Sequence, residues 1–290
     1  MIIYVLSRFK DSYSTSRLKE EAVGLGHKVK VIDYMHCELL IDKKFTVKYL
    51  NVPLKIPDVV IARVGASSTR QGAAVLKHFQ CMGVRLLTTP EGLIQSRDKF
   101  LAMQLMKMEN LPMPKTLHFF TKTTFSNIQY EIGNPPFIIK LLESTQGLGV
   151  FLAHNKTVAE KIFATYMSSN EPFLVQEFIK ESSGKDIRAF VVGDDVVASM
   201  ERVALSGEFR SNLHRGGTAY KVELTDEERD IAIRAANVFG LEIAGVDILR
   251  SKKGPLLLEV NSSPGLEGIE KYSEVNVTEH IIKWIEQHGN

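Results

Sequence analysis

Short apolar runs alternate with helical segments from the first residues onward, and this alternation most limits the fold that the chain can adopt. Apolar runs at residues 2–6 and 28–33 flank a helical pattern at residues 14–25. A strand, a helix and a second strand in this order predict a parallel sheet. The same pattern continues with a strand over 59–62, a helix over 71–82 and a strand over 84–87. We therefore expect a small α/β domain at the N-terminus.

The rest of the chain has further strands and helices in a less regular order. Thr225 and Glu228 have the spacing of a capping box at the start of a helix. A length of 290 residues fits about two domains of roughly 150 residues each. The expected class is a mixed α/β (α+β) protein. Strands are expected over 136–142, 150–153, 173–179, 187–192, 196–203, 243–249 and 255–260, and helices over 98–109, 158–167, 225–239 and 278–287.

Composition and charge argue against several classes of protein. The chain is 44% apolar and 24% charged, which is typical of globular proteins and not of disordered or fibrous ones. Thirty-six basic residues against 34 acidic ones give a net charge of +2, so we expect no direct nucleic-acid binding. No apolar run approaches the ~20 residues of a membrane span, and the N-terminus lacks a signal-peptide pattern. Cys37 and Cys81 are distant and form no CxxC motif, which favours a reduced, cytoplasmic location.

Two acidic residues and an asparagine gather in the C-terminal part of the chain. Two expected strands flank the turn-like sequence Ser-Lys-Lys-Gly at residues 251–254. If the hairpin is centred on Lys253, Asp247 lies opposite Glu259. Side chains alternate along a strand, so Asn261 shares a face with Glu259.

Three oxygen-bearing side chains on one face suit a hard divalent cation such as Mg²⁺. A solvated hairpin face would show the same acidic residues. The hairpin centre also puts Leu249 and Leu257 on this face, so it is not simply polar. The spacing alone leaves both interpretations open.

A pair of glycines and two lysines indicate a phosphate site. Backbone amides around Gly147 and Gly149 could surround phosphate oxygens, although the spacing is not that of a P-loop or Rossmann motif. A plain hairpin turn would explain the glycines equally well. Lys140 ends the preceding apolar strand, and Lys99 follows Asp98 at the start of a helix. Together the lysines and the glycine turn suit a polyphosphate, whereas either lysine alone would more often be a solvated charge.

The polar loop over 209–217 contains two arginines and two glycines. Arg210, Asn212 and Arg215 could bind phosphates or a developing negative charge. The alternative is an ordinary surface loop. His214 in the same loop is interpreted as a structural polar residue rather than a base.

Three more charged residues sit at the ends of expected strands. Glu177 interrupts an apolar strand, and Asp186 begins another. Both fit nucleotide recognition, although Glu177 also fits an exposed strand edge. Arg63 closes a strand of the N-terminal domain, and the crevice beyond the carboxyl ends of parallel strands is where α/β sheets bind ligands.

In combination, these segments resemble the ATP-grasp carboxylate–amine ligases, and most closely the RimK family of glutamate ligases. The similarity runs over nearly the whole chain, and the order and spacing of the segments make chance agreement improbable. The segments that carry it are residues 97–99, 140–149, 175–177, 186–188, 209–217, 244–250 and 258–270.

The resemblance implies an ATP-grasp fold in three parts. An N-terminal pre-ATP-grasp α/β domain is expected over 1–95. A central (lid) domain is expected over 96–178, and a C-terminal domain with the metal site over 179–290. ATP is expected between the last two domains.

The family pattern implies roles for individual residues. Lys99 and Lys140 are expected at the ATP phosphates, and Asp186 at the ribose. Glu177 and Phe178 are expected to meet adenine, largely through the backbone, so the phenylalanine in place of a tyrosine found in many relatives should matter little. The complete expected nucleotide-binding set is Lys99, Lys140, Gly147, Gly149, Glu177, Phe178, Asp186, Arg210, Ser211 and Asn212.

The resemblance also implies a metal site and catalytic arginines. Asp247, Glu259 and Asn261 are expected to hold Mg²⁺ or Mn²⁺, with two ions in the site. The arginines expected to neutralise charge during the reaction are Arg202, Arg210 and Arg215.

The implied reaction is the phosphorylation of a carboxylate by ATP, followed by attack of an amine on the acyl phosphate. RimK-type enzymes add glutamate to the acidic C-terminal tail of a small-subunit ribosomal protein, and the product could be extended to poly-glutamate. A homo-oligomer, either a dimer or a tetramer, is also implied. One alternative is a sister ligase that joins glutamate to a biosynthetic carrier protein or a coenzyme. Another is a synapsin-like module that binds ATP without ligase activity.

Overall fold

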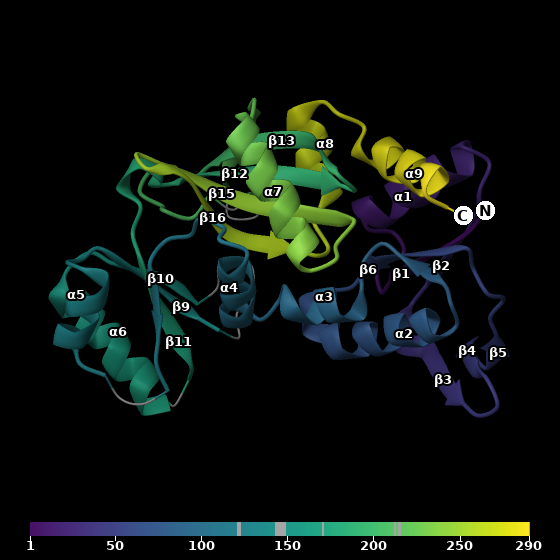
Figure 1. Ribbon diagram of the computed structural model, residues 1–290, viewed down its shortest axis with the longest axis horizontal. Coiled ribbons are helices and arrows are strands. Elements are labelled where there is room, and N and C mark those ends of the chain that lie inside the picture. Colours follow the sequence, from purple (N-terminus) through teal and green to yellow (C-terminus); the bar gives the residue numbers. More distant parts are fainter. Residues whose placement is uncertain (121–122, 143–148, 170, 212, 214–215, 290) are drawn as a thin grey trace.

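The computed structural model describes residues 1–120, 123–142, 149–169, 171–211, 213 and 216–289. In these residues the chain forms four β-sheets, which helices cover (Figure 1). No helix in the same residues is long and apolar enough to cross a membrane. The predicted mixed α/β class is confirmed.

The N-terminal sheet has the order β2-β1-β6-β7, and all of its strand pairs are parallel. The parallel sheet that the alternating pattern predicted is therefore confirmed. Its helices α1 and α2 supply buried apolar residues such as Leu18 and Phe79 to the cores on either side of the sheet. The elements are β1 (Ile2–Ser7), α1 (Tyr13–Gly24), β2 (Lys28–Ile32), β6 (Val59–Arg63), α2 (Thr69–Cys81), β7 (Arg85–Leu86) and α3 (Pro90–Gln95).

A small antiparallel sheet, β3-β4-β5, lies between β2 and β6 in the sequence and was not predicted. Its strands are β3 (Cys37–Ile41), β4 (Phe45–Tyr49) and β5 (Val52–Pro53). Several of its apolar side chains are exposed, including Leu40 and Ile41. The alternation of buried and polar residues that marks a strand is therefore weak here. Short 3₁₀ helices occur at Tyr34–His36, Ala66–Ser68 and Lys180–Ser182.

The central sheet has the order β10-β9-β11-β8 and is antiparallel. Helices α5 and α6 lie together on it, at the left of Figure 1. Phe137, Phe163 and Phe173 are buried between the sheet and these helices. The elements are β8 (Thr116–His118), α5 (Phe125–Ile132), β9 (Phe137–Leu141), β10 (Val150–Ala153), α6 (Lys156–Ser169) and β11 (Phe173–Glu177).

The C-terminal sheet has the order β14-β13-β12-β15-β16, and all of its strand pairs are antiparallel. Alternate residues of β12 serve two cores: Ala189 packs with α7 on one face, and Phe190 packs with α8 and α9 on the other. The predicted capping box of α7 is confirmed, since Thr225 and Glu228 cap each other. The elements are β12 (Lys185–Val192), β13 (Asp195–Val203), β14 (Thr218–Lys221), α7 (Asp226–Val238), β15 (Ile243–Ser251), β16 (Gly254–Asn261), α8 (Leu266–Ser273) and α9 (Val277–Gln287).

Helix α4 (Lys99–Met108) joins the N-terminal region to the rest of the chain. Its buried residues Met103 and Met106 belong to the core beneath α7, not to the core of the central sheet. The helix therefore fixes Lys99 against the C-terminal sheet, although the sequence placed it at the start of the central domain. The domain limits at 95 and 178 stay a prediction.

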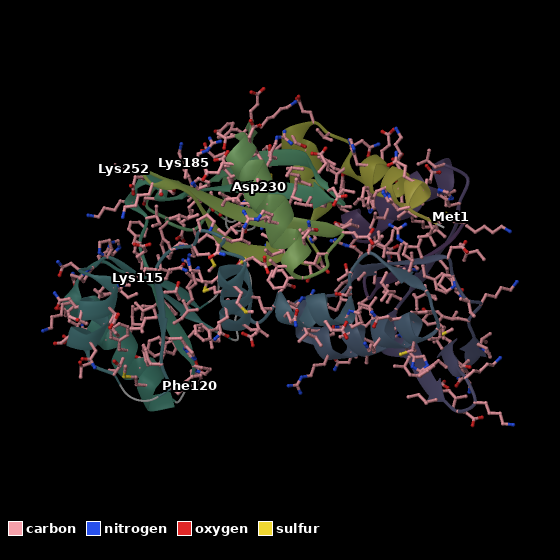
Figure 2. The ribbon with its side chains drawn as sticks, viewed as in Figure 1. Met1, Lys115, Phe120, Lys185, Asp230 and Lys252 are labelled. Carbon is pink, nitrogen blue, oxygen red and sulfur yellow. The ribbon has the colours of Figure 1, made fainter. Side chains whose placement is uncertain are left out.

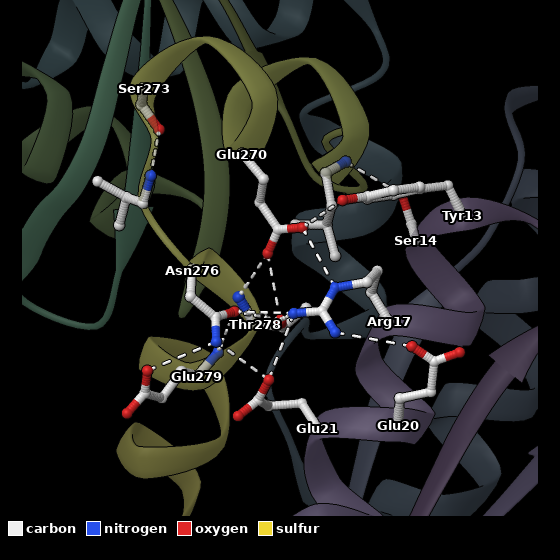
Figure 3. Close-up of polar contacts among 12 residues, drawn as sticks. Tyr13, Ser14, Arg17, Glu20, Glu21, Glu270, Ser273, Asn276, Thr278 and Glu279 are labelled. Carbon is white, nitrogen blue, oxygen red and sulfur yellow. Dashed lines mark hydrogen bonds and ion pairs between the residues drawn. The ribbon is translucent and has the colours of Figure 1, made fainter.

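The N-terminal region and the C-terminal helices pack as one unit. Ile3 and Val5 of β1 share a core with α8 and α9. Arg17 on α1 donates to the side-chain oxygens of Asn276 at 3.0 Å and Thr278 at 3.1 Å (Figure 3). Figure 3 also shows Tyr13, which donates to Glu270 Oε2 at 2.9 Å. This junction holds the carboxyl edge of the N-terminal sheet close to the residues that follow β16.

Candidate active site

The β15–β16 pair brings the predicted metal ligands together. Asp247 lies opposite Glu259, and Gly245 lies opposite Asn261. Asn261 Nδ2 donates to Glu259 Oε1 at 3.2 Å and to the Gly245 carbonyl at 3.3 Å. The side-chain oxygen of Asn261 can therefore contact another group. The predicted pairing of Asp247 with Glu259 is confirmed, and the binding of a metal there stays a prediction.

The predicted centre of this hairpin is wrong by half a residue. Ser251 pairs with Gly254, so the turn consists of two residues, one of which is Lys252 at the tip in Figure 2. Leu257 pairs with Ile248 rather than with Leu249. The pairing register shifts by one residue between this pair and the Asp247–Glu259 pair. This bulge cancels the error in the centre. It also means that Leu257 lies on the opposite, buried face from the carboxylates, contrary to the prediction.

A network of buried ion pairs holds Asp247 in place. Arg188 Nε and Nη2 donate to the two carboxylate oxygens of Asp247, the second at 2.8 Å. Arg202 Nη2 lies 2.8 Å from Asp247 Oδ2. Burial alone would raise the pKa of Asp247, but the charges and hydrogen bonds of both arginines outweigh it and hold that pKa at about 2. Asp247 therefore remains an anion at neutral pH.

The same network contains Asp186, which the resemblance placed at the ribose. Arg202 Nε and Nη2 donate to its two oxygens at 2.6 and 2.7 Å. Ser211 Oγ donates to Asp186 Oδ2 at 2.6 Å. Arg202, which the sequence placed among the catalytic arginines, is thus neutralised by two carboxylates. The ribose contact and the catalytic role both stay predictions.

Lys99, Lys140 and Glu259 influence one another electrostatically. Burial lowers the pKa of Lys140 to about 8. The positive charge of Lys99 also lowers this pKa, whereas the negative charge of Glu259 raises it. Burial also lowers the pKa of Lys99, whose Nζ donates to the Leu142 carbonyl at 2.8 Å. The two lysines from α4 and β9 thus lie near the carboxylates of β15 and β16.

Glu259 is open to solvent but closely flanked by protein atoms. This partial desolvation raises its pKa, and the neighbouring Asp247 carboxylate acts in the same direction. Arg188 and Lys140 act in the opposite direction. A carboxylate crowded by a second carboxylate and open on one side is well suited to receive a cation.

Glu177 and Phe178 lie at the end of β11, beside the start of β8. Glu177 exchanges two hydrogen bonds with Lys115, which Figure 2 labels: its N–H donates to the Lys115 carbonyl at 2.9 Å, and its Oε1 accepts from the Lys115 N–H at 2.7 Å. Phe178 follows the strand and is half-buried. Their contact with adenine stays a prediction.

The loop after β13 reaches the central sheet through Arg210. Arg210 Nη1 donates to the Val150 carbonyl at 3.3 Å, and Nη2 donates to Glu208 Oε2 at 2.7 Å. Hydrogen bonds from Arg210 lower the pKa of Glu208 to about 2. Glu208 was not predicted as a site residue, although an acid two residues before a candidate arginine was a usable signal.

Some predicted site residues lie outside the described residues, namely Gly147, Asn212 and Arg215, as does His214. Gly149 is described and has a φ of +71°, a conformation that favours glycine. Its carbonyl accepts from the Leu141 N–H at 2.8 Å, which closes the end of the β9–β10 pair.

Comparisons with known proteins cover nearly all of the chain. Residues 1–93 match the RimK PreATP-grasp domain, and residues 96–285 match the RimK-like ATP-grasp domain. A relative from Shewanella denitrificans, named "Probable alpha-L-glutamate ligase 2", is 48% identical over 289 residues, which are 99% of this chain and 96% of the relative.

Two solved structures of one ATP-grasp ligase, PsnB, have a similar fold. The complex with a minimal precursor has a TM-score of 0.78 and 20% identity, and the match covers 100% of this chain and 98% of PsnB. The complex with minimal precursor, Mg and ADP has a TM-score of 0.77 at 19% identity, again covering 100% and 98%. The predicted ATP-grasp fold with a pre-ATP-grasp domain is confirmed.

Proposed function

This chain belongs to the RimK-like ATP-grasp family of ligases, and from that premise we propose that it uses ATP to join glutamate to a carboxylate acceptor. The observation that carries the proposal is the meeting of two lysines and two carboxylates, Lys99, Lys140, Asp247 and Glu259, where α4 and the central sheet approach the C-terminal sheet. The names of the curated relatives support glutamate as the substrate.

The donor set of the proposed metal site fits Mg²⁺ or Mn²⁺. Asp247 and Glu259 supply carboxylate oxygens, and Asn261 supplies a neutral oxygen beside them. We propose that these three residues hold two ions. A solved complex of PsnB contains Mg and ADP, which supports the use of a metal ion with the nucleotide. The bound ions would offset negative charge on the phosphates.

The proposed reaction has two steps. An oxygen of the acceptor carboxylate attacks the γ-phosphorus of ATP, which forms an acyl phosphate and releases ADP. The amino group of glutamate then attacks the acyl carbon, loses a proton and expels phosphate, so that an amide remains. Lys99, Lys140 and Arg210 would lower the cost of the charge that develops in the first step. Arg202 would act through Asp186 and Asp247, which it holds in position.

We propose that the acceptor is the acidic C-terminal tail of a small-subunit ribosomal protein. Each added glutamate carries a new carboxylate, so the product can serve as the next acceptor and poly-glutamate can form. Peptide-bound ATP-grasp structures such as the PsnB complex support a polypeptide acceptor. We further propose a cytoplasmic homo-oligomer, a dimer or a tetramer.

Glutamate-dependent ADP release tests this function. Purified protein with ATP and Mg²⁺ should release ADP over many turnovers only when glutamate and an acceptor are both present, because glutamate is needed to consume the acyl phosphate. ADP release with a biosynthetic carrier protein or coenzyme, but not with the ribosomal tail, would favour the sister ligase. ATP binding without ADP release under any combination would favour a binding module and contradict the proposal.

ATP affinity should weaken at alkaline pH because the pKa of Lys140 is lowered to about 8. A lysine that loses its proton no longer attracts phosphate, so affinity should fall by up to about tenfold per pH unit above that value. Calorimetric titration with a non-hydrolysable ATP analogue between pH 7 and pH 9.5 would measure this fall. Lys140→Arg should remove the pH dependence, since a guanidinium stays charged across the range. A fall of equal steepness in that variant would contradict the assignment.

Gly245→Ala should lower turnover because there is no room for a side chain at this position. A Cβ there would lie 2.8 Å from Pro264 Cβ and 3.1 Å from Arg188 Cδ. Either the loop after β16 or the arginine that holds Asp247 would have to move. A displacement of this size in a site can reduce activity by roughly 10- to 100-fold. Gly24→Ala is the control, since a Cβ at Gly24 meets nothing within 4 Å. Equal activity of the two variants would contradict the prediction.

A further inference from the structure

Arg63 and Arg97 are two half-buried arginines that lie close together without a counter-charge. In the described part of the chain neither forms an ion pair with a carboxylate, in contrast to Arg188, Arg202 and Arg210. Burial lowers the pKa of each to about 10, and the charge of Arg97 lowers that of Arg63 as well. Both remain charged at neutral pH. Desolvated cations without a partner favour the binding of an anion.

Arg63 has most of its hydrogen-bonding capacity left over. Its Nη1 donates to the Pro264 carbonyl at 2.7 Å, and no other described residue accepts from it. A guanidinium carries five N–H donors, so the other four are available to a ligand. Two parallel N–H groups of a guanidinium match the two oxygens of a carboxylate.

Arg97, by contrast, is committed to holding the surrounding backbone. Its Nη1 donates to the Gly65 carbonyl at 2.9 Å and to Thr69 Oγ1 at 2.7 Å. Its Nη2 donates to the Val64 carbonyl and to Ser263 Oγ. Arg97 thus fixes the loop after β6 to the loop after β16, and its positive charge lies beside Arg63.

The position of Arg63 places it near the proposed reaction site. It ends β6, opposite Ser7 of β1, at the carboxyl edge of the parallel sheet where α/β folds bind ligands. Pro264, which it contacts, comes three residues after Asn261 in the sequence. The ring of Pro264 also lies against Gly245, beside Arg188. One short loop therefore separates Arg63 from the carboxylates of the proposed metal site.

We propose that Arg63, positioned by Arg97, binds a non-reacting carboxylate of one of the two substrates, glutamate or the acceptor tail, at a subsite next to the proposed metal site. The proposal rests on the glutamate ligase function proposed above. In that reaction the lysines and metal ions would contact the phosphates and the reacting carboxylate. Glutamate and an acidic tail both carry further carboxylates that do not react. The carboxylate could come from the incoming glutamate or from the end of the acceptor tail, and the experiment distinguishes the two.

Steady-state kinetics of Arg63→Ala and Arg63→Lys test the proposal. Loss of a charged, bidentate contact should raise the KM for one substrate by roughly 10- to 100-fold, with the KM for ATP changed less than about twofold. Arg63→Lys should fall in between, because lysine keeps the charge but cannot form the paired hydrogen bonds. Arg70→Ala is the matched control, since Arg70 is exposed on the neighbouring helix α2.

The pattern of the KM values identifies the source of the carboxylate. A rise confined to glutamate assigns Arg63 to the incoming amino acid, and a rise confined to the acceptor assigns it to the tail. The proposal would be overturned if the KM for ATP rose as much as the KM for glutamate or for the acceptor. It would also be overturned if the KM values of Arg63→Ala equalled those of Arg70→Ala.

A calorimetric binding experiment separates this inference from the proposed function. Glutamate and an acidic peptide are titrated separately into wild type and Arg63→Ala, each with a non-hydrolysable ATP analogue and Mg²⁺. Wild type should bind one of them at least 10-fold more tightly than the variant does, even if no glutamate-dependent ADP is ever detected. Absence of ADP release would count against the ligase, whereas equal binding or no binding in both proteins would overturn the role of Arg63.

Discussion

Glu259→Ala should abolish turnover while leaving the fold intact. The Glu259 carboxylate lies opposite Asp247 and beside Asn261, so its loss removes one of two anionic ligands from the proposed metal site. Without correctly placed ions, we expect kcat to fall by roughly 1,000-fold, which corresponds to about 4 kcal/mol of transition-state stabilisation. The side chain is open to solvent on one side, so the melting temperature should change by no more than a few degrees.

Glu267→Ala is the matched control for this variant, since Glu267 is an exposed glutamate in the first turn of α8. It should retain nearly full activity. Steady-state ADP release over a range of Mg²⁺ and Mn²⁺ concentrations would measure both variants. If Glu259→Ala had the same kcat as the wild type at ordinary Mg²⁺ concentrations, Glu259 would not be a metal ligand.

Arg202→Ala should be the most destabilising single change in the site. Arg202 is 6% exposed and bridges Asp186 and Asp247, the second of which is 3% exposed. Its removal leaves two desolvated carboxylates with too little positive charge. Breaking a buried pair from one side typically costs about 3–5 kcal/mol. Chemical denaturation at pH 7 would measure the loss in the free energy of unfolding.

At acidic pH, the free energy of unfolding of Arg202→Ala should differ less from that of the wild type. The pKa of Asp247 is lowered in the folded state from 3.8 to about 2, so its ion pairs stabilise the fold fully above pH 3.8 and progressively less as the pH falls towards 2. Arg229→Ala is the control, because the Arg229–Asp195 pair is exposed at 3.6 Å and should contribute less than about 1 kcal/mol. Equal stability of Arg202→Ala and Arg229→Ala would contradict the importance of the network.

The sequence predicted those features of the site that depend on short-range regularity. Residues 247, 259 and 261 share one face because side chains alternate along paired strands, and this argument succeeded although the turn was placed half a residue away. The bulge between Leu257 and Glu259 has no marker in the sequence. The parallel N-terminal sheet was predictable for the same kind of reason, since its strands and helices follow one another at regular intervals.

Features that depend on distant contacts could not be predicted. Arg202, Asp186 and Asp247 come from three adjacent strands, and only the order β13-β12-β15 makes them neighbours. Asp186 and Arg202 were therefore expected in separate roles, and their ion pair was not predicted. Arg97 similarly bonds to the loop after β6 and to Ser263, which no local pattern indicates.

The intact mass of the acceptor after reaction tests the proposed function most directly. Small-subunit ribosomal proteins with acidic C-terminal tails are incubated with the enzyme, ATP, Mg²⁺ and glutamate, with Glu259→Ala as the inactive control. We expect a ladder of masses on one such protein, each step equal to one glutamyl residue, and no change with the control. An unmodified ribosomal protein, together with glutamylation of a carrier protein or coenzyme, would contradict the proposed acceptor. No mass change and no ADP with any acceptor would contradict the ligase function itself.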